Sequence, residues 1–241
     1  HVSVVEGIVE RITPHGNKKT KDRVITREFN QKVGQPFNKF LVRRSVEKVY
    51  NLGFFDDVNV RLTQGSTEET VNIEVDVLEH KTGTITLGAG YSDADGFVGI
   101  VEVGEENLRG TGDKVKVHWE FGGTAGYKNY SVSYLRPWID RKGTSLGVTY
   151  YNQLNEYTDY NEKGQSKATY DRKSNGFNIS LGRQTGEFTR DYVTLEHRKD
   201  TYVWDNKDSS GFRYDTDVNG GPGSGYRWNN EGYKFASTGY I

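Results

Sequence analysis

Histidine and carboxylate side chains are the groups in this sequence that could bind a metal or transfer a proton. The five histidines are His1, His15, His80, His118 and His197. No two of them have the close spacing of paired zinc ligands, and no cysteine is present to complete a site. The carboxylates alternate along polar strand faces or lie in turns, where solvation explains them. We therefore expect no enzyme activity, no metal and no cofactor.

Two short motifs resemble ligand-binding loops, but each lacks residues that the chemistry needs. The segment 93–96, Asp-Ala-Asp-Gly, starts like a calcium loop, yet the later ligands and the closing glutamate are missing. We read it as a hairpin turn. The glycine-rich segment 220–225 has no Gly-Lys-Ser/Thr and no strand leading into it, so it is no phosphate loop.

The overall composition excludes some partners and favours a membrane barrel. Lysine and arginine number 32 and aspartate and glutamate 33, a net charge of −1 that gives no field attracting nucleic acid. Only 33% of residues are hydrophobic, yet 13% are aromatic, including 16 tyrosines. Polar lumen-facing positions and interfacial aromatic girdles give a membrane β-barrel this composition. A soluble β-sandwich with a tyrosine-rich surface is the alternative.

Beyond Gly83 the sequence alternates apolar and polar residues in segments of about ten, separated by glycine, asparagine and aspartate, as membrane barrel strands do. The clearest segment has Val115, Val117, Trp119 and Phe121 on one face. Its other face has Lys114, Lys116, His118 and Glu120. We expect the first set to face lipid and the second a wet lumen, which makes His118 a solvated side chain rather than a catalyst.

Residues 1 to about 80 predict a small α+β module of order β-α-α-β-β. Thr20 is expected to cap a first helix that ends at Gly34, with an apolar stripe of Val24, Ile25 and Phe29. A second helix restarts at Asn38, and Gly53 follows it in a left-handed conformation. Its apolar face is formed by Val42, Val46, Val49 and Tyr50. The closing strand places Val71, Ile73, Val75 and Val77 on one face.

Several stretches of the sequence resemble those of a known protein family. The module resembles a POTRA domain, specifically the last one before the barrel in BamA-type outer-membrane assembly proteins, in VERITPHGNKKTKDRVITREF, RRSVEKVYNLGFFDDVNVRL and VNIEVDVLEHKTG. Later strings, ENLRGTGDKVKV and YDRKSNGFNISLGRQTGEFTRDYVTLEH among them, resemble the first half of that barrel. We expect a POTRA domain over residues 1–80 and a partial antiparallel transmembrane barrel over 81–241. Residues 203–241 are read as an external loop with one more strand.

The resemblance implies a location in the outer membrane, with the POTRA module in the periplasm. It implies a protein that folds and inserts other β-barrels, whose partners are unfolded clients, membrane lipid and accessory periplasmic or lipoprotein subunits. The first barrel strand would pair with client strands at a lateral seam. Its residues are Thr84, Ile85, Thr86, Leu87, Gly88, Ala89, Gly90 and Tyr91. Its glycines either weaken the strand so that the seam opens or fit barrel curvature.

Other readings remain open at this level. Within the family, the chain could belong to a two-partner-secretion pore or a TamA-like translocation factor. Outside it, a passive pore with a periplasmic anchor domain or a soluble β-rich binding protein fits the pattern. A basic patch of Lys18, Lys19, Lys21 and Arg23 could meet lipid headgroups or a partner, or lie in solvent. The chain has no methionine and begins at His1, so we expect a processed or trimmed piece.

Overall fold

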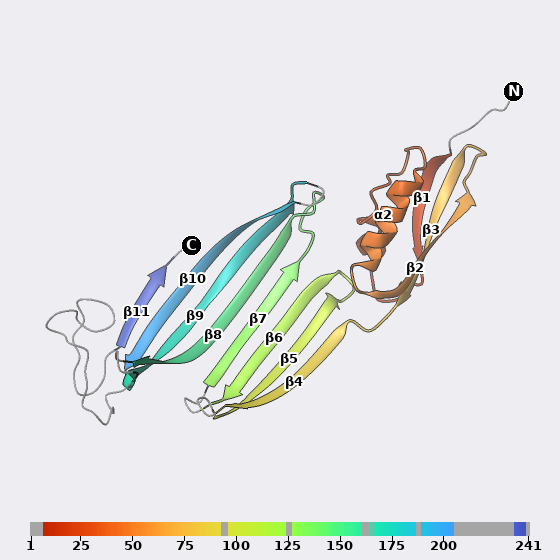
Figure 1. Ribbon diagram of the computed structural model, residues 1–241. Coiled ribbons are helices and arrows are strands. Elements are labelled where there is room, and N and C mark those ends of the chain that lie inside the picture. Colours follow the sequence, from red (N-terminus) through yellow and green to blue (C-terminus); the bar gives the residue numbers. More distant parts are fainter. Residues whose placement is uncertain are drawn as a thin grey trace. The chain divides into compact units, whose positions relative to one another are not determined.

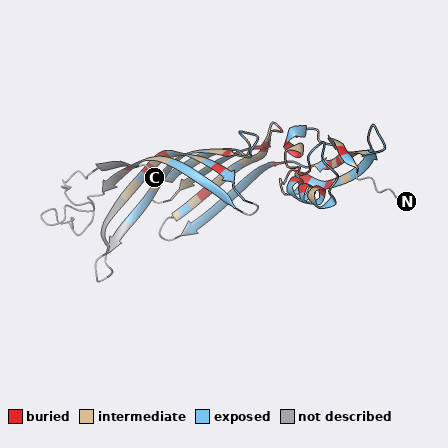
Figure 2. Ribbon diagram, turned by 90° about the horizontal axis from the view of Figure 1, so that it is seen from above, coloured by how far each residue is buried: buried red, intermediate tan, exposed pale blue. Residues whose placement is uncertain are grey.

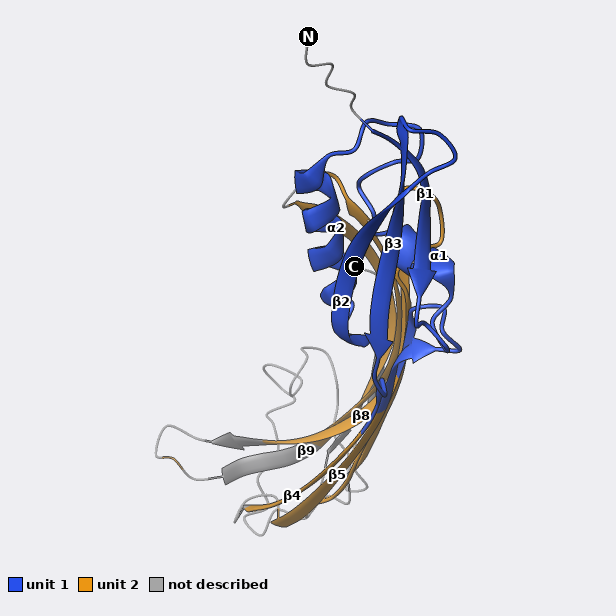
Figure 3. Cartoon of the chain, turned by 90° about the vertical axis from the view of Figure 1, so that its right-hand side faces the viewer, with its two compact units in different colours: residues 1–84, 104–115 blue, residues 85–103, 116–241 orange. Residues whose placement is uncertain are grey.

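A computed structural model describes residues 7–92, 96–123, 127–160, 164, 166–186, 189–204 and 234–239. The chain divides into two compact units. The first comprises His1–Thr84 with Gly104–Val115, and the second Ile85–Val103 with Lys116–Ile241 (Figure 3). Within the described ranges, no helix is long and apolar enough to cross a membrane.

The first unit is built on a three-stranded sheet of order β1-β3-β2 (Figure 1). Strand β1 (Ile8–His15) is parallel to β3 (Thr70–Glu79), and β2 (Phe55–Gln64) is antiparallel to β3. Because a parallel pair needs a crossover connection, the two helices lie between β1 and β2 in the chain. This confirms the expected β-α-α-β-β order.

The core of this module lies between the sheet and helices α1 (Asp22–Thr26) and α2 (Lys39–Tyr50). Its buried side chains are Val9, Val24, Ile25, Phe29, Val42, Val49, Phe54, Phe55, Val58, Ile73, Val75 and Val77. Figure 2 shows these buried positions in red within the module. Alternate residues of β3 supply three of them, as the period-two pattern predicts.

The expected first helix is wrong in two respects. It ends at Thr26 rather than near Gly34, because the following chain turns to bond with β1. Gly34 N–H donates to the Val9 carbonyl at 2.7 Å, and Val9 N–H donates to the Gln35 carbonyl at 3.0 Å. Thr20 is not the cap either, since Lys21 holds that position without a side-chain hydrogen bond.

The second helix is confirmed with one correction. The Asn38 side chain accepts the N–H groups of Phe40 and Leu41, and Gly53 has a φ of +73° just beyond the helix. Tyr50, however, is 54% exposed and does not join the apolar face. Val49, expected on the same face, is buried at that end of the helix.

The second sheet has eight strands in sequential order from β4 to β11. They are β4 (Gly83–Ser92), β5 (Gly96–Leu108), β6 (Asp113–Gly122), β7 (Tyr127–Arg136), β8 (Ser145–Tyr160), β9 (Ser166–Gln184), β10 (Arg190–Trp204) and β11 (Lys234–Gly239). Neighbours are antiparallel wherever their register is defined, from β7 to β11. The calcium-like residues 93–95 and the segment 220–225 lie outside the described residues.

Candidate strand-pairing site

Strand β4 stands at one end of the eight-stranded sheet, with β5 as its neighbour (Figure 1). Among the described residues, its other edge has no paired strand. Residues Thr84 to Tyr91 are all exposed. The apolar side chains Ile85, Leu87 and Tyr91 are 74%, 74% and 75% exposed. The expected pairing residues therefore form a strand whose backbone can accept another strand by edge-to-edge hydrogen bonding.

No close contact with a described residue requires glycine at Gly88 or Gly90 of β4. A Cβ at Gly88 would lie 3.7 Å from the Cβ of Ile100, an ordinary contact, and one at Gly90 would meet nothing within 4 Å. Neither glycine has a left-handed backbone. Alanine fits both positions, so steric need does not account for glycine there.

Strand β6 separates apolar from charged side chains as the alternation predicts. Val117 and Trp119 are exposed, and the ring of Trp119 lies 4.9 Å from that of Phe121. On the other face, Glu102 of β5 accepts from Lys116 Nζ at 2.9 Å and contacts His118 Nδ1 at 3.4 Å. His118 thus contacts the same cross-strand carboxylate as Lys116.

A second set of exposed apolar side chains crosses strands β8 to β10 of the second unit. Val148 of β8 pairs in register with Ile179 of β9, which pairs with Leu195 of β10. All three side chains are exposed. Cross-strand neighbours in register project from the same face of a sheet, so this row is one exposed apolar wall. Exposed rows of this kind are typical of a lipid-facing surface.

The opposite face of β8 to β10 carries an ionic cluster around the buried Asp200 that sequence reasoning missed. Asp200 accepts hydrogen bonds from Ser174 Oγ at 2.7 Å, Arg172 Nη2 at 2.9 Å and Arg198 Nε at 3.1 Å. The hydroxyl of Tyr151 donates to Glu196 beside it. Beside Asp200 lies a hollow of about 390 Å³ whose walls are Tyr151, Gln153, Asn155, Tyr157, Arg172, Ser174, Glu196 and Arg198. Alternation predicts a polar face here, but no local spacing signals that Asp200 binds residues 26 and 28 positions away.

One further motif has the form of a catalytic serine elbow. Residues Gly143 to Gly147 read Gly-Thr-Ser-Leu-Gly. Ser145 starts β8, is buried, and donates from Oγ to the Gly182 carbonyl at 3.2 Å. An elbow needs its serine exposed on a strand-to-helix turn, so Ser145 is a structural residue. Among the described residues, no group of histidines and carboxylates is arranged to hold a metal.

Family comparisons agree with this geometry. A POTRA model, described as a surface antigen variable number repeat, matches residues 7–80, and the Omp85 superfamily domain matches residues 107–238. The outer membrane protein assembly factor BamA of Neisseria meningitidis is 30% identical over 183 residues, 76% of this chain and 22% of the relative. BamA of Neorickettsia risticii is 33% identical over 156 residues, 64% of this chain. The chain spans only about a fifth of these relatives, 22% and 21%.

Solved structures share the fold. BamA from Haemophilus ducreyi lacking POTRA domains 1–3 aligns with a TM-score of 0.71 at 22% identity, over 97% of this chain and 42% of that one. CdiB from Acinetobacter baumannii aligns with a TM-score of 0.54 at 18% identity, over 82% of this chain and 41% of that one. The predicted fold, a POTRA domain followed by antiparallel barrel strands, is confirmed, as is the outer-membrane location. Since the family model covers more than half of its 241 residues, the chain belongs to the Omp85 superfamily.

Proposed function

We propose that this chain is part of an outer-membrane insertase that folds β-barrel clients and inserts them into the membrane without enzymatic chemistry. Residues 1–80 would be the last POTRA domain, in the periplasm, and residues 81–241 the N-terminal part of the barrel. The observation that carries the proposal is that β4 is the first strand of the eight-stranded sheet and directly follows the POTRA module in the chain. The similarity to BamA proteins supports the same role.

The mechanism is strand addition at the lateral seam, defined as Thr84 to Tyr91 of β4. An unpaired strand edge presents N–H and C=O groups that template an incoming strand. Backbone hydrogen bonds are independent of side-chain identity, so one seam can serve clients of different sequence. A client strand that pairs there can recruit its own next strand in the same way.

Contact between the exposed apolar side chains and lipid would hold the seam at the membrane depth where clients insert. Val115, Val117, Trp119 and Phe121 of β6 are the residues that we assign to lipid contact. The outer edge of β2 in the POTRA sheet would bind unfolded clients or accessory periplasmic subunits by the same strand pairing, because the outer edge of β1 already bonds to Gly34 and Gln35 at Val9. The partners are thus client strands, membrane lipid and accessory subunits.

A proline scan along β4 tests seam templating. Alternate residues of an antiparallel strand direct N–H and C=O to the same edge. Proline placed in turn at Thr86, Leu87, Gly88 and Ala89 therefore removes N–H groups alternately from the free edge and from the ladder with β5. We expect one alternate pair of variants to abolish client assembly while the barrel still folds, and the other pair to disturb the barrel itself.

The controls for the scan retain every N–H group. Alanine at Thr86 and Leu87, and serine at Ala89, should support normal assembly. A disulfide that locks β4 to the final barrel strand of the full-length protein should also stop assembly. Loss without alternation, or normal assembly with the seam locked, would refute the templating mechanism.

A translocation pore with the same fold predicts a different phenotype. Depleting an insertase lowers the levels of many outer-membrane proteins at once. Depleting a pore that exports one partner lowers only that partner, and depleting a passive pore changes permeability alone. Quantifying the outer-membrane proteome after depletion of the full-length protein therefore separates the three functions.

A further inference from the structure

The turn between β5 and β6 belongs to the same compact unit as the POTRA module, and a buried polar contact joins them. Asn107, at the end of β5, is 1% exposed, and Thr20, in the loop before α1, is 3% exposed. Asn107 Nδ2 donates to Thr20 Oγ1 at 2.7 Å. Its Oδ1 accepts the N–H of Gly112 at 2.8 Å, so both ends of the amide are used.

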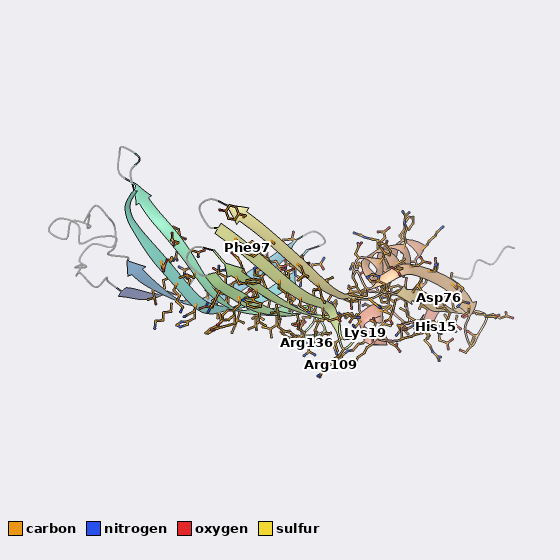
Figure 4. All side chains as sticks on the ribbon, turned by 90° about the horizontal axis from the view of Figure 1, so that it is seen from below. His15, Lys19, Asp76, Phe97, Arg109 and Arg136 are labelled. Atoms are coloured by element: carbon orange, nitrogen blue, oxygen red, sulfur yellow. The ribbon has the colours of Figure 1, made fainter. Side chains whose placement is uncertain are left out.

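Backbone contacts bring the turn against the POTRA loop. The N–H of Lys21 donates to the Gly110 carbonyl at 2.9 Å. Gly110 has a φ of +71°, and a Cβ there would lie 1.8 Å from the Lys19 carbonyl oxygen. Only glycine permits this approach. Figure 4 labels Lys19 and Arg109, which mark the loop and the tip of the turn.

The POTRA loop is itself held from its other side. The Glu79 carboxylate accepts the N–H groups of Lys18 and Lys19 at 2.8 Å each and that of Thr20 at 2.6 Å. Lys19 Nζ in turn lies 3.0 Å from Glu105 Oε2 of β5. The backbone of the loop is therefore held between the end of β3 and the end of β5, and this places the Thr20 hydroxyl beside Asn107.

We propose that Asn107 is a positioning residue that makes the β5–β6 turn a structural part of the POTRA module. Movements of the module are then transmitted to β5, the strand paired with β4. Client capture in the periplasm would thereby alter the seam. The effect on clients rests on the proposed function, whereas the attachment of the turn to the module does not.

The test measures distances by spin labelling in the full-length protein. The 241 residues contain no cysteine, so introduced cysteines are the only labels among them. One pair, Glu68→Cys with Lys142→Cys, spans from the POTRA module to the β7–β8 turn, and both positions are exposed. A second pair, Glu68→Cys with Lys39→Cys, lies within the module and reports its folding.

Asn107→Ala should broaden the distance distribution of the first pair and leave that of the second unchanged. Losing the amide leaves the Gly112 N–H and the Thr20 hydroxyl without this partner, and we expect the attached state to weaken by about tenfold or more. Asn59→Ala, an exposed asparagine on β2, is the matched control and should change neither pair. An unchanged first pair, or broadening of both pairs, would overturn the assignment of Asn107.

Substitutions of Thr20 test the contact from its other side. Thr20→Val keeps the shape but removes the hydroxyl that accepts from Asn107, and should reproduce the broadening. Thr20→Ser keeps the hydroxyl and should leave the distribution as it is in the unsubstituted protein. Equal broadening by both variants would overturn the role of this hydrogen bond.

Client insertion into vesicles is measured separately on the same variants. If Asn107→Ala broadens the first pair and slows insertion, the coupling is supported. Broadening with a normal insertion rate would overturn the coupling while leaving the proposed function intact. Failure of the unsubstituted protein to insert clients would instead refute the proposed function, because the distance distributions are recorded without client.

Discussion

Under the proposed function, replacing both seam glycines by alanine should slow client insertion without preventing folding. Gly88 and Gly90 lie within β4, where glycine weakens a strand by roughly 0.5–1 kcal/mol relative to alanine because it loses more backbone freedom. The structure adds no steric penalty, since the new Cβ atoms would lie 3.7 Å or more from described neighbours. The double substitution should therefore stabilise the paired state of β4 by about 1–2 kcal/mol.

That stabilisation has a direct kinetic consequence if clients enter by opening the seam. A change of 1–2 kcal/mol alters an equilibrium by a factor of roughly 5–30. The rate of client insertion into vesicles by purified full-length protein should fall by about this factor. Hydrogen exchange of the β4 amides should slow in parallel, because exchange reports the same opening.

Gly147→Ala is the matched control. Gly147 lies in β8, a strand with neighbours on both sides, and its new Cβ would make ordinary contacts at 3.7 Å with Ser180 and 3.8 Å with Leu135. We expect insertion at the unsubstituted rate. A double seam variant that inserts clients normally, or an equal slowing by Gly147→Ala, would refute the reasoning. A folding defect of the double variant would favour the curvature explanation for these glycines.

Two further predictions concern charge. Burial raises the pKa of Glu79, but the hydrogen bonds from Thr20, Lys19 and Lys18 outweigh it and hold that pKa below its ordinary value of 4.5. Because the pKa of Glu79 is lowered in the folded state, its carboxylate stabilises the fold above the unfolded pKa, and this stabilisation is lost as pH falls through the folded pKa. Glu79→Gln should therefore lower the denaturation midpoint at neutral pH and match the unsubstituted protein well below about pH 4. A constant difference at all pH values would contradict this. If β6 faces lipid as proposed, Val117→Arg places a charge in hydrocarbon and should destabilise the barrel by about 2–4 kcal/mol in folding titrations into vesicles. His118→Arg on the opposite face should cost little, and equal costs would show that β6 does not face lipid.

Local patterns predict those features that depend on neighbours in sequence. Alternation in β3 predicts that Ile73, Val75 and Val77 are buried, because a strand projects alternate residues to the same face. Asn38 caps α2 through N–H groups two and three residues ahead, so the cap is visible in the sequence. The same locality explains why the charged face of β6 could be assigned.

Features that depend on distant partners could not be predicted in this way. Thr20 has the residue type of a helix cap, but its hydroxyl bonds with Asn107, 87 positions away. The first helix is short because its expected continuation bonds with β1 instead. Asp200 likewise reads as one polar residue in an alternating strand, although it is buried against Arg172 and Ser174. Each of these outcomes is set by tertiary contacts that local spacing does not encode.

The surroundings of β4 also constrain how its seam can open. The strand has ten residues, and in an antiparallel sheet about half of their N–H and C=O groups point to each edge. Every such group left unpaired in hydrocarbon costs several kcal/mol, so complete separation of β4 from the final barrel strand of the full-length protein would be prohibitive. Under the proposed strand addition, a client strand would therefore replace that final strand a few hydrogen bonds at a time, with each new bond forming as an old one breaks. Under this exchange, a small stabilisation of β4 changes the rate, whereas a single missing N–H halts the replacement where it occurs.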